Sequence, residues 1–130
     1  TENGKKIAPF TTLGGLFARA DQFKQKFPYV LPPRWMEKKS SINMNTPFNF
    51  VSTNDIIGGN SGSPTINQNG ELVGLIFDGN IQSLIGDFYY DESVNRAISV
   101  DSRGMLEVLK KVFDANHIAT ELTTNQVSVR

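Results

Sequence analysis

The sequence contains no cysteine, and His117 is its one histidine among 130 residues. Without thiols the chain can form neither a disulfide nor a thiolate metal site, and it has no cysteine nucleophile. One imidazole is too few for a metal site built from several histidines. These two absences exclude several common classes of redox and metal chemistry.

An excess of charge of one sign is also missing. Thirteen basic residues balance thirteen acidic ones. A surface for nucleic acid or for an anionic membrane needs more lysine and arginine than that, so we expect neither partner. No apolar run approaches the roughly 18 residues that span a bilayer. Residues 1–6 are polar, unlike a signal peptide, and no initiator methionine is present. We therefore expect a piece of a longer protein.

Hydrophobic spacing predicts a helix near each end of the chain. Residues 11–27 have apolar side chains at helical spacing, a threonine at position 11 or 12 to cap them, and Pro28 to end them. Residues 29–35 contain a Pro-Pro pair and predict an extended connector. Residues 101–115 predict a second helix. Residues 120–130 predict a polar, frayed tail.

The middle of the chain indicates short strands. Alternating side chains from Pro47 onward and an almost wholly apolar run after an Asn-Gly turn are both typical of β structure. The apolar run fits a buried strand. We expect strands over residues 47–53, 65–66, 71–77 and 96–100, with a long loop over residues 80–92.

Residues 58–64, Gly-Gly-Asn-Ser-Gly-Ser-Pro, are the segment most suggestive of chemistry. A serine hydroxyl is a poor nucleophile unless a tight turn exposes it and a base takes its proton. Acyl transfer also needs backbone N–H groups aimed at the developing oxyanion. Glycines on both sides of a serine permit the turn and clear the approach. In the chymotrypsin-like arrangement the two donors would be the N–H groups of Ser61 and Gly59.

A plain turn or linker can contain the same glycine-rich string. Three features favour the catalytic interpretation. A strand precedes the loop, Pro64 ends it before a hairpin, and the next apolar strand reaches Asp78 and Gly79. That spacing suits a specificity pocket built from both segments.

Asn60 departs from the trypsin-like pattern, which has an acid directly before the serine. That acid pairs with a newly freed N-terminus when a zymogen is cleaved. A neutral amide cannot form such a salt bridge, so we predict that no proteolytic activation is needed.

Residues 49–64, together with residues 11–15, 72–80 and 91–97, resemble the bacterial dipeptidyl-peptidase 7 and 11 family of serine peptidases. The resemblance covers nearly the whole chain and is closer to the dipeptidyl-peptidase 7 type. It implies the second β-barrel of a chymotrypsin-like double barrel, in a mainly β chain with flanking helices. It also implies a periplasmic homodimer without metal or cofactor that releases dipeptides from the free N-termini of oligopeptides.

On this resemblance the chain divides into four parts. Residues 1–46 would form a helix and connector, and residues 47–100 the β-barrel portion with the nucleophile. Residues 101–119 would form the C-terminal helix and residues 120–130 the tail. The catalytic histidine and aspartate would lie upstream, in the other half of the catalytic domain. The isolated fragment is therefore expected to be inactive.

The resemblance also implies residue roles. Ser61 would be the nucleophile, and Gly59 with Ser61 would donate to the oxyanion. Asp78 would bind the substrate's α-ammonium group, which a carboxylate does through a charge-assisted hydrogen bond. Gly79 would lie in the specificity pocket. In the relatives that cut after Asp or Glu, this position looks like arginine. A glycine predicts a preference for a hydrophobic residue before the scissile bond.

Other interpretations stay open at this point. Asp55, six residues before the serine, matches the acid that selects basic residues in trypsin-like endopeptidases, or it supports the loop. His117 is either catalytic or a surface residue at a helix end. Trp35 and the aromatic residues 88–90 either contact substrate or pack. A third alternative is a non-catalytic barrel that binds a partner.

Overall fold

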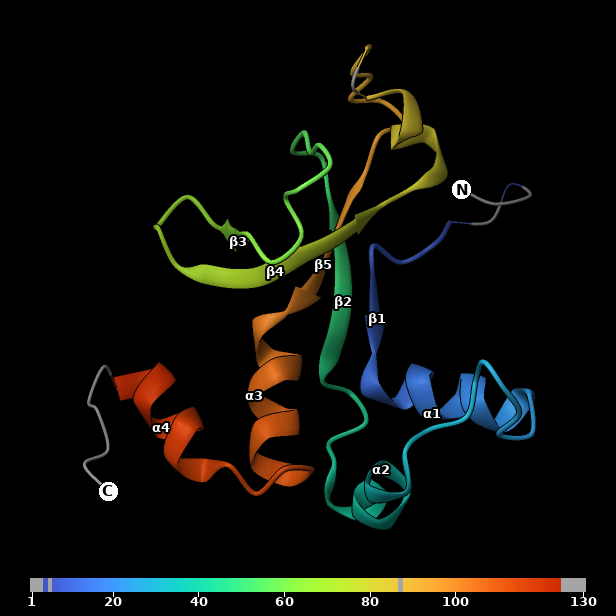
Figure 1. Ribbon diagram of the computed structural model, residues 1–130, viewed down its shortest axis with the longest axis vertical. Coiled ribbons are helices and arrows are strands. Elements are labelled where there is room, and N and C mark those ends of the chain that lie inside the picture. The colour runs from blue at the N-terminus through green and yellow to red at the C-terminus, as the bar shows by residue number, and fades with distance from the viewer. Residues whose placement is uncertain (1–3, 5, 87, 125–130) are drawn as a thin grey trace. The chain divides into compact units, whose positions relative to one another are not determined.

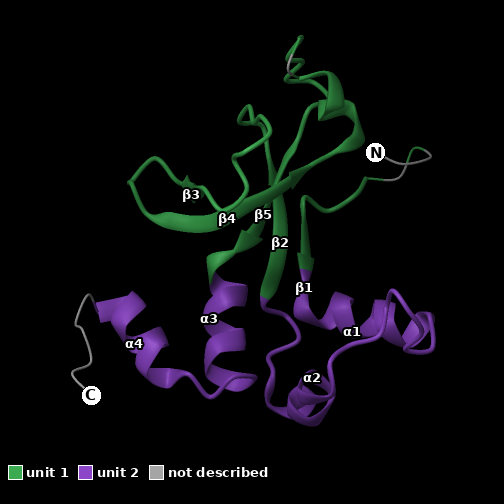
Figure 2. Ribbon diagram, viewed as in Figure 1, with its two compact units in different colours: residues 1–11, 47–102 green, residues 12–46, 103–130 purple. Residues whose placement is uncertain are grey.

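The computed structural model describes residues 4, 6–86 and 88–124, whose helices and strands are drawn in Figure 1. The chain divides into two compact units, shown in Figure 2. The first unit contains residues 1–11 and 47–102, and the second contains residues 12–46 and 103–130. None of the helices in the described part is long and apolar enough to cross a membrane.

The first unit is built on a five-stranded sheet. Its strands are β1 (Phe10–Thr12), β2 (Pro47–Ser52), β3 (Pro64–Ile66), β4 (Leu72–Gly79) and β5 (Ala97–Asp101). They lie in the order β1-β2-β5-β4-β3, and the pairs β2–β5, β5–β4 and β4–β3 are antiparallel. Helices lie between β1 and β2 and after β5 in the sequence, so the sheet with flanking helices confirms the expected fold class.

The central strand β5 supplies the core of the sheet through alternate side chains. Ala97, Ser99 and Asp101 are buried, as the two-residue period of a strand requires. The buried hydroxyl of Ser99 shares a 2.8 Å hydrogen bond with the hydroxyl of Thr65. This bond offsets the cost of placing a polar group inside.

Strand β4 is less buried than its apolar sequence predicts. Only Gly74 and Ile76 are buried, and Phe77 is 47% exposed. The reason is a β-bulge. Ile76 and Asp78 pair with consecutive residues of β5, so Phe77 is an extra residue in the strand. A bulge bends a strand and re-aims the side chains beside it.

Residues 80–92, expected as a loop, contain a short 3-10 helix, η2 (Ile81–Ile85). Asn80 caps it, because its Oδ1 atom accepts a hydrogen bond from the Ser83 N–H at 3.2 Å. Figure 1 shows η2 directly after β4. This places the helix at the same end of β4 as Asp78 and Gly79.

The second unit is helical. It contains α1 (Leu13–Gln22), α2 (Pro33–Lys38), the 3-10 helix η1 (Lys39–Ser41), α4 (Asn116–Thr124) and all but the first residue of α3 (Ser102–Lys111). Its buried apolar side chains come from these helices and the turns beside them: Leu13, Phe17, Ala20, Ile42, Val112 and Ala119.

Helix α1 starts where the sequence predicts but ends five residues early. The Thr12 hydroxyl accepts a hydrogen bond from the Gly15 N–H at 3.1 Å, so the predicted N-cap is confirmed. The predicted end at Phe27 is wrong, because Lys24 and Gln25 adopt positive φ values of 54° and 53°. Backbone in that region cannot continue a right-handed helix.

Three further expectations about the helical segments differ from the structure. The connector predicted for residues 29–35 is wrong at its end, where Pro33 takes the first position of α2, a place that suits proline. The single helix predicted over residues 101–115 ends early, at Lys111, and Asp114 beyond it has a φ of 55°. The tail predicted from Thr120 is helical to Thr124 within α4. Residues 125–130 of that tail lie outside the described residues.

Candidate active site

The glycine-rich loop between β2 and β3 is a closed series of tight turns. The N–H of Asn60 donates to the carbonyl oxygen of Ile57 at 3.1 Å, and the N–H of Ser63 donates to that of Asn60 at 2.9 Å. Gly59 and Gly62 have φ values of +97° and +89°. Side-chain-bearing residues rarely adopt this backbone, which explains glycine at both positions.

Two hydrogen bonds fix the loop to the sheet. The N–H of Gly62 donates to the carbonyl oxygen of Ile76 at 2.8 Å, and the N–H of Ile76 donates to that of Ser63 at 3.0 Å. The segment around Ser61 is thus tied to β4 immediately before the bulge at Phe77. The loop therefore has a defined position relative to Asp78 and Gly79.

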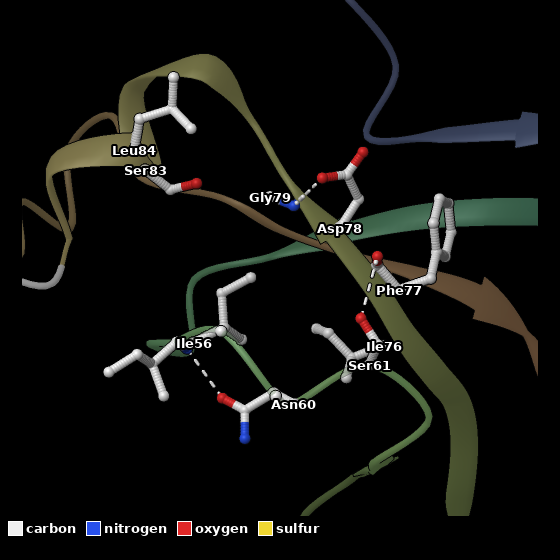
Figure 3. A pocket seen from close by; sticks show the side chains of 12 residues that line it. Ile56, Asn60, Ser61, Ile76, Phe77, Asp78, Gly79, Ser83 and Leu84 are labelled. Atoms are coloured by element: carbon white, nitrogen blue, oxygen red, sulfur yellow. Dashed lines mark hydrogen bonds between the residues drawn. The ribbon is translucent and has the colours of Figure 1, made fainter.

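The side chain of Asn60 forms a hydrogen bond within the loop. Its Oδ1 atom accepts a hydrogen bond from the Ile57 N–H at 2.8 Å (Figure 3). Asn60 is half-buried, whereas Ser61 next to it is exposed. The neutral amide thus has a partner within its own loop.

Ser61 has the exposure that a nucleophile needs. Its Oγ atom lies 3.5 Å from the carbonyl oxygen of the bulge residue Phe77, as Figure 3 shows. Within the described residues, the N–H groups of Gly59 and Ser61 have no hydrogen-bond acceptor in the chain. An oxyanion site requires two such donors beside an exposed hydroxyl, both aimed at the same point.

All four predicted site residues line one pocket of about 310 Å³. Three segments of the first unit form it: residues 56–61 of the loop, residues 76–79 of β4, and residues 83–84 of η2. Gly59 and Ser61 come from the first segment, and Asp78 and Gly79 from the second. Residues 22 or more positions apart in the sequence, such as Ser61 and Ser83, thus share one cavity.

Asp78 is exposed, and its Oδ1 atom accepts a hydrogen bond from the Gly79 N–H at 2.8 Å. This bond fixes the orientation of the carboxylate and leaves its second oxygen available. Figure 3 shows the carboxylate and Ser83 on opposite sides of β4. Because Asp78 is exposed and its second oxygen is available, it can offer a negative charge to a cationic ligand group.

Several lining residues were not predicted from the sequence. Ile56, Ile57 and Leu84 give the pocket apolar walls, and Ser83 adds a hydroxyl next to Gly79. The apolar residues before Gly58 were one available signal for a pocket wall. No pattern in residues 80–92 indicates that η2 folds back onto the pocket.

Asp55 does not line the pocket that contains Ser61. It lines a second cavity of about 300 Å³ together with residues such as Asn54 and Thr65. The carboxylate that would select basic residues in a trypsin-like pocket is therefore not at the pocket floor. Its position argues against the trypsin-like interpretation.

The remaining candidate residues lie elsewhere. His117 is an exposed residue of α4 in the second unit, and it does not line the Ser61 pocket. Trp35 packs near Phe17, with ring centroids 6.4 Å apart. Phe88 is 94% exposed, so its side chain is available for contacts. The packing interpretation holds for Trp35.

The turn that follows η2 carries one perturbed carboxyl group. The Ser93 hydroxyl and, second, the Ser93 N–H donate to Asp91 at 2.6 and 2.9 Å and lower its pKa below the usual value. Arg96 donates to backbone carbonyl oxygens of Glu92, Ser93 and Asn95 in the same segment.

Within the described residues no cluster of three metal-binding side chains occurs.

Comparison with known proteins supplies the context for this geometry. The chain is 40% identical over 130 residues to dipeptidyl-peptidase 7 of Phocaeicola vulgatus, covering 94% of this chain and 18% of that protein. It is 49% identical over 118 residues to dipeptidyl-peptidase 7 of Porphyromonas endodontalis, covering 87% of this chain and 14% of that protein. The chain thus spans less than a fifth of the length of these relatives.

The fold also matches solved structures. The crystal structure of Porphyromonas endodontalis DPP11 in complex with the dipeptide Arg-Glu aligns with a TM-score of 0.81 and 28% sequence identity, covering 94% of this chain and 18% of that one. A family model described as peptidase S46 matches residues 1–124. With an exposed serine on a glycine-rich loop, a pocket beside it and a family match over almost its whole length, the chain belongs to the peptidase S46 family.

Proposed function

We propose that this chain is the nucleophile-bearing part of a serine dipeptidyl-peptidase. The observation that carries the proposal is the exposed Ser61 hydroxyl, which shares a pocket with Asp78 and stands next to two N–H groups without acceptors. The names of the two relatives described above support the same activity. The complete site needs the upstream half of the catalytic domain.

In this mechanism Ser61 Oγ attacks the carbonyl carbon of the second residue of a peptide, whose bond to the nitrogen of the third residue breaks. A histidine from the upstream half takes its proton, and an aspartate orients that histidine. The N–H groups of Gly59 and Ser61 stabilise the oxyanion. The histidine then protonates the leaving amine, and water releases the dipeptide from Ser61.

Asp78 makes the enzyme an exopeptidase in this proposal. The α-ammonium group of a free N-terminus carries a positive charge that an internal peptide bond lacks. The available carboxylate oxygen of Asp78 can accept a charge-assisted hydrogen bond from it. Only a chain end would then gain this interaction.

The walls of the pocket favour an apolar side chain before the scissile bond. Ile56, Ile57 and Leu84 line it, and Gly79 adds no charge. Desolvating an acidic side chain there without a cationic partner would be costly. We therefore propose that the substrate carries a hydrophobic residue at its second position.

The family resemblance supports three broader parts of the proposal. The parent enzyme would have a chymotrypsin-like double β-barrel, act in the periplasm and form a homodimer. Cell fractionation would test the compartment, and light scattering on the purified full-length protein would test the dimer. Retention in the cytoplasm or a monomer would contradict the corresponding part.

The deciding experiment measures release of a fluorogenic leaving group from dipeptide substrates by the full-length enzyme. We expect cleavage of substrates with a free N-terminus and a hydrophobic second residue, and loss of cleavage when the N-terminus is acetylated. Cleavage of acetylated substrates after Lys or Arg would instead indicate a trypsin-like endopeptidase. A protein that cleaves none of them and whose Ser61 does not react with a fluorophosphonate probe would fit the partner-binding barrel.

A further inference from the structure

The hydroxyl of Ser83 occupies the space that a side chain at position 79 would need. A Cβ atom built on Gly79 would lie 2.3 Å from Ser83 Oγ, 3.4 Å from Ser83 Cβ and 3.2 Å from Ile56 Cδ1. Real Cβ atoms do not approach another heavy atom within 2.3 Å. Figure 3 shows the Ser83 oxygen pointing toward Gly79. The contact is steric, since the φ of Gly79 is not in the left-handed region.

The Ser83 hydroxyl is held in this position. It donates to the carbonyl oxygen of Asn80 at 2.6 Å. The Ser83 N–H donates to the same carbonyl oxygen at 2.9 Å and lies 3.2 Å from Asn80 Oδ1. Turning the hydroxyl away from Gly79 would break the 2.6 Å bond, at a net cost of roughly 1 kcal/mol.

Asn80 is in turn fixed to the start of β5. Its Nδ2 group donates to the carbonyl oxygen of Val94 at 2.7 Å, and its Oδ1 atom accepts from the Arg96 N–H at 2.9 Å. The Asn80 N–H donates to the carbonyl oxygen of Arg96 at 2.9 Å. Helix η2, and Ser83 with it, therefore has a defined place beside the pocket.

We propose that Ser83 is a second specificity-determining residue and that positions 79 and 83 act as a coupled pair. Gly79 leaves the floor of the pocket open, and Ser83 limits how far it opens. A larger residue at 79 fits only if the Ser83 hydroxyl gives up its hydrogen bond to Asn80 and turns away, or if the residue at 83 becomes smaller. The assignment of this pocket to the side chain before the scissile bond rests on the proposed function. The steric coupling between the two positions does not.

The coupling predicts an outcome for the stability of the folded enzyme. Gly79→Ala introduces the 2.3 Å contact, so it lowers the melting temperature of the full-length protein. Ser83→Ala removes the oxygen and leaves Ser83 Cβ at an ordinary 3.4 Å from the new methyl group. The double variant is therefore more stable than Gly79→Ala alone, which reverses the usual additivity of two destabilising changes.

Gln82→Ala is the matched control. Gln82 is an exposed neighbour on η2 that does not line the pocket, and it should not rescue Gly79→Ala. Equal melting temperatures for wild type and Gly79→Ala would overturn the coupling. So would additive shifts for Gly79→Ala and Ser83→Ala, or a rescue by Gln82→Ala as large as that by Ser83→Ala.

The same variants test the role of Ser83 in substrate specificity. Ser83→Ala widens an apolar pocket, so the ratio of kcat/KM for a phenylalanine substrate over an alanine substrate should rise by roughly tenfold. Gly79→Arg combined with Ser83→Ala should gain more activity toward an aspartate substrate than Gly79→Arg alone. An unchanged ratio in Ser83→Ala, from a wild-type enzyme that cleaves these substrates, overturns the inference. A wild-type enzyme that cleaves none of them overturns the proposed function.

Discussion

The Oδ1 atom of Asn60 accepts a 2.8 Å hydrogen bond from the N–H of Ile57, and this bond closes the turn that presents Ser61. In trypsin-like enzymes an acid at this place needs a partner created by proteolysis. In this chain the hydrogen-bond partner of Asn60 is the Ile57 N–H, which belongs to the same loop. The geometry supports an active loop that forms as soon as the chain folds.

The Asn60 bond predicts a difference between two substitutions. Asn60→Ala removes the acceptor, and losing about 1 kcal/mol of loop stabilisation should lower kcat about fivefold or more. Asn60→Asp keeps an acceptor of the same shape and should retain more activity. Steady-state kinetics of the uncleaved full-length enzyme provide the measurement. Activity that appears only after limited proteolysis would contradict this account.

Two adjacent glycines give a matched test of the oxyanion loop. A Cβ on Gly58 or Gly59 meets no atom within 4 Å, but only Gly59 has a positive φ, of +97°. Gly59→Ala should therefore strain the backbone by about 1–3 kcal/mol and lower kcat by about tenfold or more. Gly58→Ala should stay within about twofold of wild type. Equal effects of the two changes would argue against a strained turn at Gly59.

The role of Asp78 predicts a loss specific to the substrate's N-terminus. In its proposed role the Asp78 carboxylate pairs with the α-ammonium group, and Asp78→Asn removes the charge of that pair, a bond worth roughly 1.5–3 kcal/mol. The kcat/KM for free dipeptide substrates should fall by about tenfold to a hundredfold. The matched control is Asp55→Asn, because Asp55 lines the other cavity. A larger effect from Asp55 than from Asp78 would favour the trypsin-like alternative.

A carboxylate in the helical unit predicts a pH dependence of stability. Hydrogen bonding to the ammonium of Lys38, 3.0 Å away, lowers the pKa of Asp114 below 3.8, with Arg34 adding to the effect. A lowered folded-state pKa stabilises the fold above pH 3.8, and that stabilisation disappears as the pH falls through the folded value.

Asp114→Asn should therefore destabilise the protein near neutral pH and have a smaller effect at a pH well below 3.8, where more of the wild-type carboxyl is protonated. Urea unfolding at the two pH values measures this. A destabilisation of the same size at both values would show that the charge of Asp114 is not responsible.

The shape of the loop could be predicted from the sequence because it is local. A serine between glycines, a strand before it and a proline after it are all contained in residues 47–64. The roles of Asp78 and Gly79 came from the family resemblance, and the structure then placed both residues in the Ser61 pocket.

The parts that the sequence did not reveal depend on contacts between distant segments. The bulge at Phe77 is visible only when β4 is paired with β5. Ser83 reaches Gly79 because Asn80 ties η2 to Arg96, sixteen residues further along the chain. The early end of α1 follows from positive φ at Lys24 and Gln25, residues whose identity does not favour that backbone.

The central claim is that Ser61 is a nucleophile. Treatment of the full-length protein with a fluorophosphonate probe, followed by peptide mapping, tests it most directly. We predict a single labelled serine at position 61, and loss of both labelling and peptidase activity in Ser61→Ala. Labelling that persists in Ser61→Ala, or a wild-type protein that cleaves dipeptide substrates while Ser61 stays unmodified, would contradict the account.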